Sequence, residues 1–248
     1  INSEGLNVSL LYLPGFAEYQ AYDPEQAAIS LAPVDFTGFM LSQFASVAEV
    51  RQAAQNIRVV PVVTPELGVA APVHFSITDR SGDQVIVEYI GGVLKIYEKT
   101  LGVLTNSPPY DWHINNARNY INMRSVDWPE VDVNGVDLAP IGYGTGLLGL
   151  PGDFTPPSRF IRALAWTQTS RPTDGGEDTV HEALRILANF QLPMEATDQK
   201  LNPAELKVLK YGGTQYTVSY DLQNLRAYFQ TSENPNVRSV DFNNFDFN

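Results

Sequence analysis

Alternation of apolar and polar residues predicts antiparallel β-structure in two parts of the chain. Residues 7–13 are rich in β-forming residues and predict a strand, which we expect in the middle of a sheet. Residues 74–78 and 84–90 flank a glycine-containing turn and predict a hairpin, which residues 93–97 extend into a meander. Three later stretches predict further antiparallel strands separated by short turns: residues 214–220, 225–231 and 237–242.

Helical spacing indicates two helices between the first strand and the hairpin, over residues 37–44 and 46–56. Ser46 and Glu49 form a capping box at the start of the second helix. The stripe of that helix that should face the core consists of Val47, Val50 and Ala54. Two stretches without clear periodicity are interpreted as a loop and a polar linker: residues 16–33 and 192–211.

The central stretch, residues 101–123, is interpreted as strand, turn and helix. Residues 102–104 are apolar and predict the end of a strand, which Pro108 and Pro109 stop because proline donates no ladder hydrogen bond. Asp111 is the expected N-cap of a helix whose spacing is set by Ile114, Ala117 and Ile121. Asn106 would then lie at a strand end. Its amide could donate hydrogen bonds to an oxygen that becomes negative during a reaction; the alternative is an asparagine that satisfies its own turn.

A second candidate residue, Arg159, follows Ser158, the predicted N-cap of another helix. The core face of this helix is expected to carry Phe160, Ile161, Leu164 and Ala165. A cation in the first helical turn opposes the helix dipole at a cost of roughly 0.3–1 kcal/mol. A thiolate or an anionic intermediate beside Arg159 would offset this cost. The alternative is an exposed arginine or one that pairs with a carboxylate.

Composition narrows the classes of function. The 248 residues are enough to bury a substantial core, as one domain or two. Sixteen basic and 28 acidic residues give a net charge of −12, which argues against a nucleic-acid partner. No apolar run reaches the roughly 18 residues of a membrane span, so no membrane association is expected. The compartment, cytoplasmic or periplasmic, stays open.

Cofactor and metal chemistry are not expected. The chain has no cysteine, so it contains no disulfide, thiolate metal ligand or cysteine nucleophile of its own. Residues 131–138 predict a short hairpin around Asn134-Gly135, and the acidic residues near it fail the calcium-loop spacing because Ile141 stands at the twelfth position. Residues 144–149 match a dinucleotide fingerprint, but Pro151 follows where a helix should begin.

Two long blocks, LGVLTNSPPYDWH at residues 101–113 and GYGTGLLGLPGDFTPPSRFIRAL at residues 142–164, resemble the choloylglycine hydrolase family. This family contains penicillin V acylases and conjugated bile salt hydrolases. Residues 1–16 and 72–92 fit it too, and the resemblance runs nearly to the C-terminus. It implies an α+β fold, the N-terminal-nucleophile hydrolase αββα sandwich of two antiparallel sheets between helical layers. We expect residues 1–248 to form a single domain.

The resemblance also implies a mechanism. Members of the family use an N-terminal cysteine, exposed by processing, as nucleophile and base. We therefore expect a further N-terminal segment, as a partner of these residues, to carry that cysteine. Asn106 and the main-chain N–H of Tyr12 would form the oxyanion hole, and Arg159 would lie beside the sulfur. For Tyr12, an aromatic ring packed on a sheet is an equally open interpretation.

Substrate and assembly follow from the same resemblance. Phe16, Tyr19 and Tyr22 would face the apolar acyl group of a small amide, unless they simply anchor their loop. Tyr12 stands where bile salt hydrolases commonly have asparagine, which favours a penicillin V acylase over a bile salt hydrolase. An inactive β-rich binding module is a further alternative. The hairpin at residues 131–138 implies a homotetramer.

Overall fold

The computed structural model of the chain describes residues 1–194, 196 and 212–246. The chain groups into two compact units, which are described separately. The first unit comprises Ile1–Thr100 and Thr173–Asn248, and the second comprises Leu101–Pro172. The expectation of one domain over residues 1–248 therefore stays a prediction. Most of the polar linker predicted at residues 192–211 lies outside the described residues.

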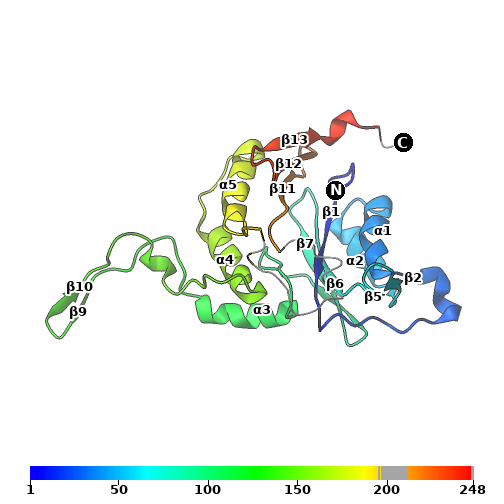
Figure 1. The fold of residues 1–248 in the computed structure, drawn as a ribbon, viewed down its shortest axis with the longest axis horizontal. Coiled ribbons are helices and arrows are strands. Elements are labelled where there is room, and N and C mark those ends of the chain that lie inside the picture. The colour runs from blue at the N-terminus through cyan, green and yellow to red at the C-terminus, as the bar shows by residue number, and fades with distance from the viewer. Residues whose placement is uncertain (195, 197–211, 247–248) are drawn as a thin grey trace. The chain divides into compact units, whose positions relative to one another are not determined.

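The first unit is built on a four-stranded antiparallel sheet (Figure 1). Its strands, in spatial order, are β1 (Asn7–Tyr12), β6 (Val73–Thr78), β7 (Gln84–Ile90) and β8 (Val93–Tyr97). The predicted hairpin and meander are thus confirmed. The expected central position of β1 is wrong, because β6 is flanked by β1 and β7 and, among the described residues, no strand pairs with the other side of β1.

Two helices, α1 (Phe36–Gln43) and α2 (Val47–Ala54), cover one face of this sheet (Figure 1). Alternate residues of β6, including Phe75, point towards them and are fully buried. The ring of Phe36 stacks on that of Phe75 with centroids 4.1 Å apart. The predicted stripe of α2 is buried in the same core. Each such buried side chain contributes roughly 1.5–3 kcal/mol to folding.

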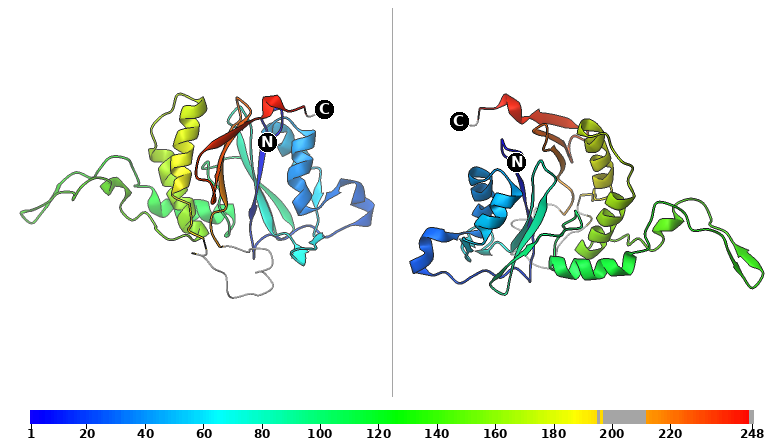
Figure 2. Two further views of the ribbon diagram at one scale, coloured as in Figure 1. Left: turned by 45° about the horizontal axis from the view of Figure 1, so that its top comes forward. Right: turned by 180° about the vertical axis from the view of Figure 1, so that it is seen from behind.

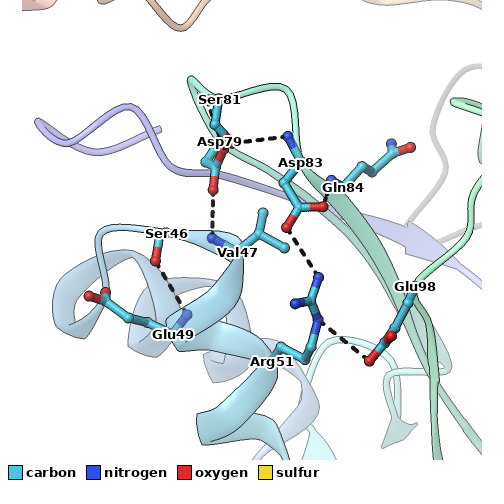
Figure 3. Close-up of polar contacts among 9 residues, drawn as sticks. All are labelled: Ser46, Val47, Glu49, Arg51, Asp79, Ser81, Asp83, Gln84 and Glu98. Carbon is cyan, nitrogen blue, oxygen red and sulfur yellow. Dashed lines mark hydrogen bonds and ion pairs between the residues drawn. The ribbon is translucent and has the colours of Figure 1, made fainter.

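The start of α2 is fixed by its own cap and by a turn of the sheet (Figure 3). The Ser46 hydroxyl accepts a hydrogen bond from Glu49 N at 3.3 Å, which confirms half of the predicted capping box. Glu49 reaches back to the N–H of Ala45 at 2.7 Å, one residue before the position expected for a capping box. The Asp79 carboxylate, 32 residues away, accepts from Val47 N at 2.8 Å.

Asp79 is surrounded by donors. Besides Val47 N, it accepts from both the N–H and the hydroxyl of Ser81, at 2.9 and 2.5 Å (Figure 3). Burial raises the pKa of Asp79, but these hydrogen bonds lower it more, so its pKa lies below the ordinary value. Beside it, Arg51 of α2 pairs with Asp83 at 3.1 Å and with Glu98 at 3.7 Å. The helix and the β6–β7 turn are therefore joined by polar contacts as well as by the core.

A three-stranded antiparallel sheet forms the second layer of the first unit, as predicted. It consists of β11 (Tyr216–Asp221), β12 (Arg226–Thr231) and β13 (Arg238–Asp241). Helix α5 (Gly176–Ala188) buries Val180 and Leu184 against Tyr228 of this sheet. In Figures 1 and 2 the three-stranded sheet lies between α5 and the four-stranded sheet, with α1 and α2 beyond. This is the expected α+β sandwich of two antiparallel sheets between helical layers.

Short elements complete the first unit. The segment interpreted as a loop, residues 16–33, contains the 3₁₀ helix Pro24–Ile29, and a second 3₁₀ helix, Pro33–Asp35, begins at its last residue. Asp23 caps the first of these by accepting from Glu25 N. The remaining strands are two residues long each: β2 (Ser30–Leu31), β3 (Arg58–Val59), β4 (Val63–Thr64) and β5 (Val69–Ala70).

The second unit contains two helices, α3 (Tyr110–Ala117) and α4 (Pro156–Thr169), and the hairpin of β9 (Val131–Val133) and β10 (Val136–Leu138). The hairpin was predicted, and both turn residues have the positive φ of a type I′ turn, 55° for Asn134 and 81° for Gly135.

The hairpin lies in a segment, residues 127–144, that we call the arm, and polar contacts close its base. The Asp127 carboxylate accepts from the N–H groups of Gly144 and Thr145, each at 2.7 Å. A Cβ at Gly146 would lie 2.4 Å from the carbonyl oxygens of Arg124 and Val126, so only glycine fits there. The two ends of the arm are therefore held side by side.

Three local predictions in the second unit are wrong. Residues 102–104 form no strand, and Gly102 has a φ of +74°, which is incompatible with an extended ladder. Helix α3 begins after Pro109, so Asp111 lies in the first turn, and Ile121 is 79% exposed instead of facing the core. Helix α4 begins after Thr155 because Pro156 and Pro157 occupy its first turn, where a missing N–H costs nothing.

Candidate active site

Asn106 is fixed by two side chains of the second unit. The Arg159 Nη2 donates to Asn106 Oδ1 at 2.8 Å, and His113 Nε2 lies 2.9 Å from the main-chain oxygen of Asn106. A guanidinium has donors and no acceptor, so the amide atom that faces Arg159 must be the oxygen. The N–H₂ of Asn106 therefore points away from Arg159. The predicted pair of Asn106 and Arg159 does come together, with the amide nitrogen oriented as a donor.

The segment that carries Asn106, residues 101–106, forms no strand and is held by hydrogen bonds that involve side chains. The Thr105 hydroxyl donates to the carbonyl oxygen of Pro156, in the first turn of α4, at 3.0 Å. The N–H of Leu101 donates to the Tyr110 hydroxyl of α3 at 2.6 Å. Residues 101–106 are thus tied to both helices, which places Asn106 without the sheet that the sequence suggested.

Arg159 stands at the end of the first turn of α4 and makes two directed contacts. Its Nε donates to the carbonyl oxygen of Phe154 at 3.0 Å while its Nη2 reaches Asn106. Burial lowers the pKa of Arg159, and the neighbouring positive charge of Arg162 lowers it further. An arginine nevertheless keeps its proton in proteins. The site therefore holds a partly desolvated positive charge, which would favour an anion nearby.

Arg162, which the sequence analysis did not select, supports the turn before α4. It is buried, and its Nη1 donates to the carbonyl oxygens of Pro151, at 2.8 Å, and of Asp153. Asp153 accepts in turn from the side chains of Thr155 and Ser158. Hydrogen bonds from Ser158 and then Thr155 lower the pKa of Asp153 to about 2. These contacts fix the turn that contains Phe154, whose carbonyl oxygen accepts the hydrogen bond from Arg159 Nε.

His113 was also missed by the sequence analysis. It is fully buried and stacks on Phe160 of α4, with ring centroids 4.5 Å apart and an interplanar angle of 9°. The signal for it was present, because His113 follows the buried Tyr110 by three residues and so shares its helical face.

Tyr12 belongs to the first unit, where it is the last residue of β1 and lies opposite Val73. Its predicted place at the end of a strand is therefore confirmed. The residue is 40% exposed, and a ring packed on the sheet stays open as the alternative interpretation. Its contribution to an oxyanion hole with Asn106 stays a prediction.

The three aromatic residues of the predicted acyl pocket differ in their surroundings. The Tyr19 hydroxyl donates to Ala71 O at 2.5 Å and accepts from Val73 N at 2.9 Å. Burial raises its pKa to about 12. Tyr19 thus anchors its loop, which was the alternative interpretation. Phe16 and Tyr22 are 42% and 58% exposed, and contact with substrate stays a prediction for both.

Within residues 1–194, 196 and 212–246, no cluster of three or more histidine, cysteine or acidic side chains has the arrangement of metal ligands. The same residues contain no helix that is both long and apolar enough to span a bilayer. The buried side chains of His74 and Glu88, on neighbouring strands of the first unit, are joined by a hydrogen bond of 2.9 Å between Nδ1 and Oε1.

A family model described as linear amide C–N hydrolases, choloylglycine hydrolase family, matches residues 1–248. The bile salt hydrolase/transferase of Clostridium perfringens is 32% identical over 243 residues, which cover 98% of this chain and 71% of that protein. The penicillin V acylase of Pectobacterium atrosepticum is 23% identical over 262 residues, covering 100% of this chain and 62% of that protein.

Solved structures agree with this fold. A variant of the conjugated bile acid hydrolase of Clostridium perfringens superposes with a TM-score of 0.82 at 29% identity, covering 99% of this chain and 73% of that one. The penicillin V acylase of Agrobacterium tumefaciens, at 24% identity, gives a TM-score of 0.72 and covers 99% and 66% of the two chains. The sandwich described above is therefore the fold of N-terminal-nucleophile hydrolases.

Proposed function

Because the chain belongs to the choloylglycine hydrolase family of linear amide C–N hydrolases, we propose that it hydrolyses the amide bond of conjugated bile salts. The proposal is carried by the higher identity to the bile salt hydrolase, 32%, than to the penicillin V acylase, 23%. Tyr12 alone favoured a penicillin V acylase over a bile salt hydrolase. The proposal reverses this preference, because similarity over the whole chain is stronger evidence than one residue.

The proposed reaction uses a cysteine that a further N-terminal segment supplies. Its thiolate attacks the amide carbonyl, and the resulting oxyanion accepts from the Asn106 amide and from Tyr12 N–H. The α-amine of that cysteine first takes the thiol proton and then gives it to the departing amine, which leaves a thioester. Water adds to the thioester and releases the acid and the thiol. No metal or organic cofactor takes part.

The orientation of Asn106 supports its assigned role. Arg159 binds the amide oxygen, so the nitrogen is the atom presented elsewhere, as an oxyanion donor requires. Arg159 has a second task in this proposal, because its charge would help to keep the cysteine sulfur as a thiolate. Phe16, Tyr19 and Tyr22 would border the apolar acyl group, with Tyr19 acting through the loop that it anchors.

The experiment compares kcat/KM for a glycine-conjugated bile salt and for penicillin V, using protein that carries its native N-terminal segment. We expect the bile salt to be cleaved faster. Faster cleavage of penicillin V would establish the second candidate, an acylase of the type that Tyr12 favours. If neither is cleaved by protein whose N-terminal cysteine has been verified by intact mass, the chain is better described as a binding module.

We further propose that the arm of the second unit mediates assembly into a homotetramer. The exposed apolar side chains of the arm include Val131, Val133, Val136, Leu138, Ile141 and Tyr143. Contiguous exposed apolar surface commonly marks an interaction site. Replacing Val136 and Leu138 by aspartate should lower the particle mass in sedimentation to that of a smaller species. An unchanged mass would exclude the arm from the interface.

A further inference from the structure

His113 is a fully buried imidazole to which the proposed reaction gives no task. Its Nε2 lies 2.9 Å from the main-chain oxygen of Asn106. A carbonyl oxygen can only accept, so Nε2 must carry a hydrogen and donate it. The hydrogen bond therefore exists in any state of the ring that keeps the Nε2 proton.

The imidazole is held at a fixed angle. Its face stacks on Phe160 at 4.5 Å with a 9° interplanar angle, and Tyr110 of the same helix meets Phe160 edge-on with centroids 6.0 Å apart. Helices α3 and α4 thus clamp the ring between them. This stacking restrains the rotation of the ring and therefore the direction of its Nε2–H, which in turn restrains the carbonyl oxygen that accepts from it.

The two contacts on Asn106 act on different atoms and come from different helices. Arg159 of α4 holds the side-chain oxygen, whereas His113 of α3 holds the main-chain oxygen. One contact sets the rotation of the amide, and the other sets the position of the backbone from which the amide extends. A displacement of about 1 Å in a catalytic group can cost on the order of 10²-fold in rate.

We propose that His113 is a positioning residue for the oxyanion donor Asn106. This inference rests on the proposed amide hydrolysis, in which Asn106 binds the oxyanion. His113 does not touch the reacting atoms; it acts through the Asn106 main chain. Its loss should therefore lower kcat and leave KM nearly unchanged, because substrate binding in the ground state does not depend on the oxyanion donor.

The test uses a pair of amide side chains of different length, in the enzyme with its native N-terminal segment. Glutamine places an N–H₂ as many bonds from Cα as the Nε2 of histidine, whereas asparagine is one bond shorter. We expect H113Q to stay within about threefold of the wild-type kcat, and H113N and H113F to lose on the order of 10- to 100-fold. The control H181Q, at an exposed position of α5, should leave kcat unchanged.

Combining H113N with N106A distinguishes a role of His113 in positioning Asn106 from a general structural role of His113. In the N106A background, H113N should change kcat by less than about twofold, because the group that it positions is already gone. Equal losses from H113N in both backgrounds would overturn the proposal. So would equal activities of H113Q and H113N, whether both are fast or both are slow.

The same variants distinguish this proposal from the proposed function. If N106A itself stays within about threefold of wild type, the oxyanion role of Asn106 is wrong and no positioning of it matters. If N106A is slow but H113N and H113F are both fast, only the proposal for His113 fails. Urea unfolding midpoints, measured for each variant, restrict the comparison to variants that are folded.

Discussion

Two polar clusters, one in each unit, tie a turn to the start of a helix, and they use opposite arrangements of donors and acceptors. In the first unit the Asp79 carboxylate accepts from main-chain and hydroxyl donors, among them the first N–H of α2 (Figure 3). In the second unit Arg159 and His113, two side-chain donors, act on the oxygens of Asn106. The first cluster satisfies groups that folding buries, whereas the second fixes the direction of a side chain.

This difference separates stability from catalysis. Leaving a buried N–H such as that of Val47 without its acceptor costs folding free energy, typically about 1–3 kcal/mol, and changes no reacting group. Moving Asn106, by contrast, displaces the atom proposed to meet the oxyanion. Substitutions in the first cluster should therefore change the free energy of unfolding, and substitutions in the second should change kcat.

The largest effect is expected for N106D. Aspartate keeps the size of the side chain and an acceptor for Arg159, but it replaces the N–H₂ donor by an oxygen. We expect kcat to fall by roughly 10²–10³-fold, with the thermal midpoint of unfolding little changed. Steady-state kinetics measure the change in kcat, and calorimetry measures the thermal midpoint of unfolding. Wild-type turnover by N106D would show that orientation of the nitrogen has no catalytic meaning.

A smaller loss is expected for R159K, about 10- to 50-fold in kcat, because lysine keeps the charge but lacks the fork that reaches Asn106 and Phe154 together. The measurement is kcat at saturating substrate, with R185K on the exposed side of α5 as the matched control. A loss below about threefold would mean that charge alone suffices, and the contrast between the clusters would then rest on Asn106 only.

For D79N the expected effect is on stability, a loss of about 1–2 kcal/mol at pH 7 with kcat unchanged. The pKa of Asp79 is lowered by folding, so its contribution is present above the pKa of the unfolded chain and is lost as the pH falls through the folded-state pKa. Urea unfolding at pH 7 and near pH 3 should therefore show a shallower acid dependence for D79N than for wild type. Parallel curves would contradict the lowered pKa.

The smallest effect is expected for Y19F, which removes the donor to Ala71 O and leaves Val73 N without its acceptor. We expect about 1 kcal/mol of destabilisation and a change in KM below threefold. Y22F, at an exposed side chain of the same loop, is the control for stability. A large rise in KM for Y19F alone would give the hydroxyl a direct role in substrate binding.

Features with local signals were predictable from the sequence. These features depend on residues that are close together in the sequence. They are the capping residue Ser46, the apolar stripe of α2, the hairpin of β6 and β7, and the type I′ turn at Asn134-Gly135. The pairing of Asn106 with Arg159 spans 53 residues, and the resemblance of two sequence blocks indicated both residues without indicating their contact.

Features set by distant contacts were not predictable. Residues 102–104 have the apolar pattern of a strand, but their segment is bound by the Tyr110 hydroxyl of α3 and by the main-chain carbonyl of Pro156 in α4, not by a neighbouring strand. Helical spacing could place His113 on the same face as Tyr110, but it could not indicate the partners of His113, because Phe160 and the Asn106 main chain become its neighbours only in the folded second unit. The predicted N-cap of α4, Ser158, lies three residues after the observed one, Thr155, because Pro156 and Pro157 form the first turn of the helix.

The closed base of the arm has a consequence for engineering. Asp127 bridges to Gly144 and Thr145, and Gly146 lies directly against the main chain of Arg124 and Val126, so the arm leaves the body and returns at one point. Because its two ends are adjacent, we expect that the arm can be replaced by a short connector with little movement of α3 and α4. The base of the arm could also carry a hairpin from another protein, so this region is suitable for grafting.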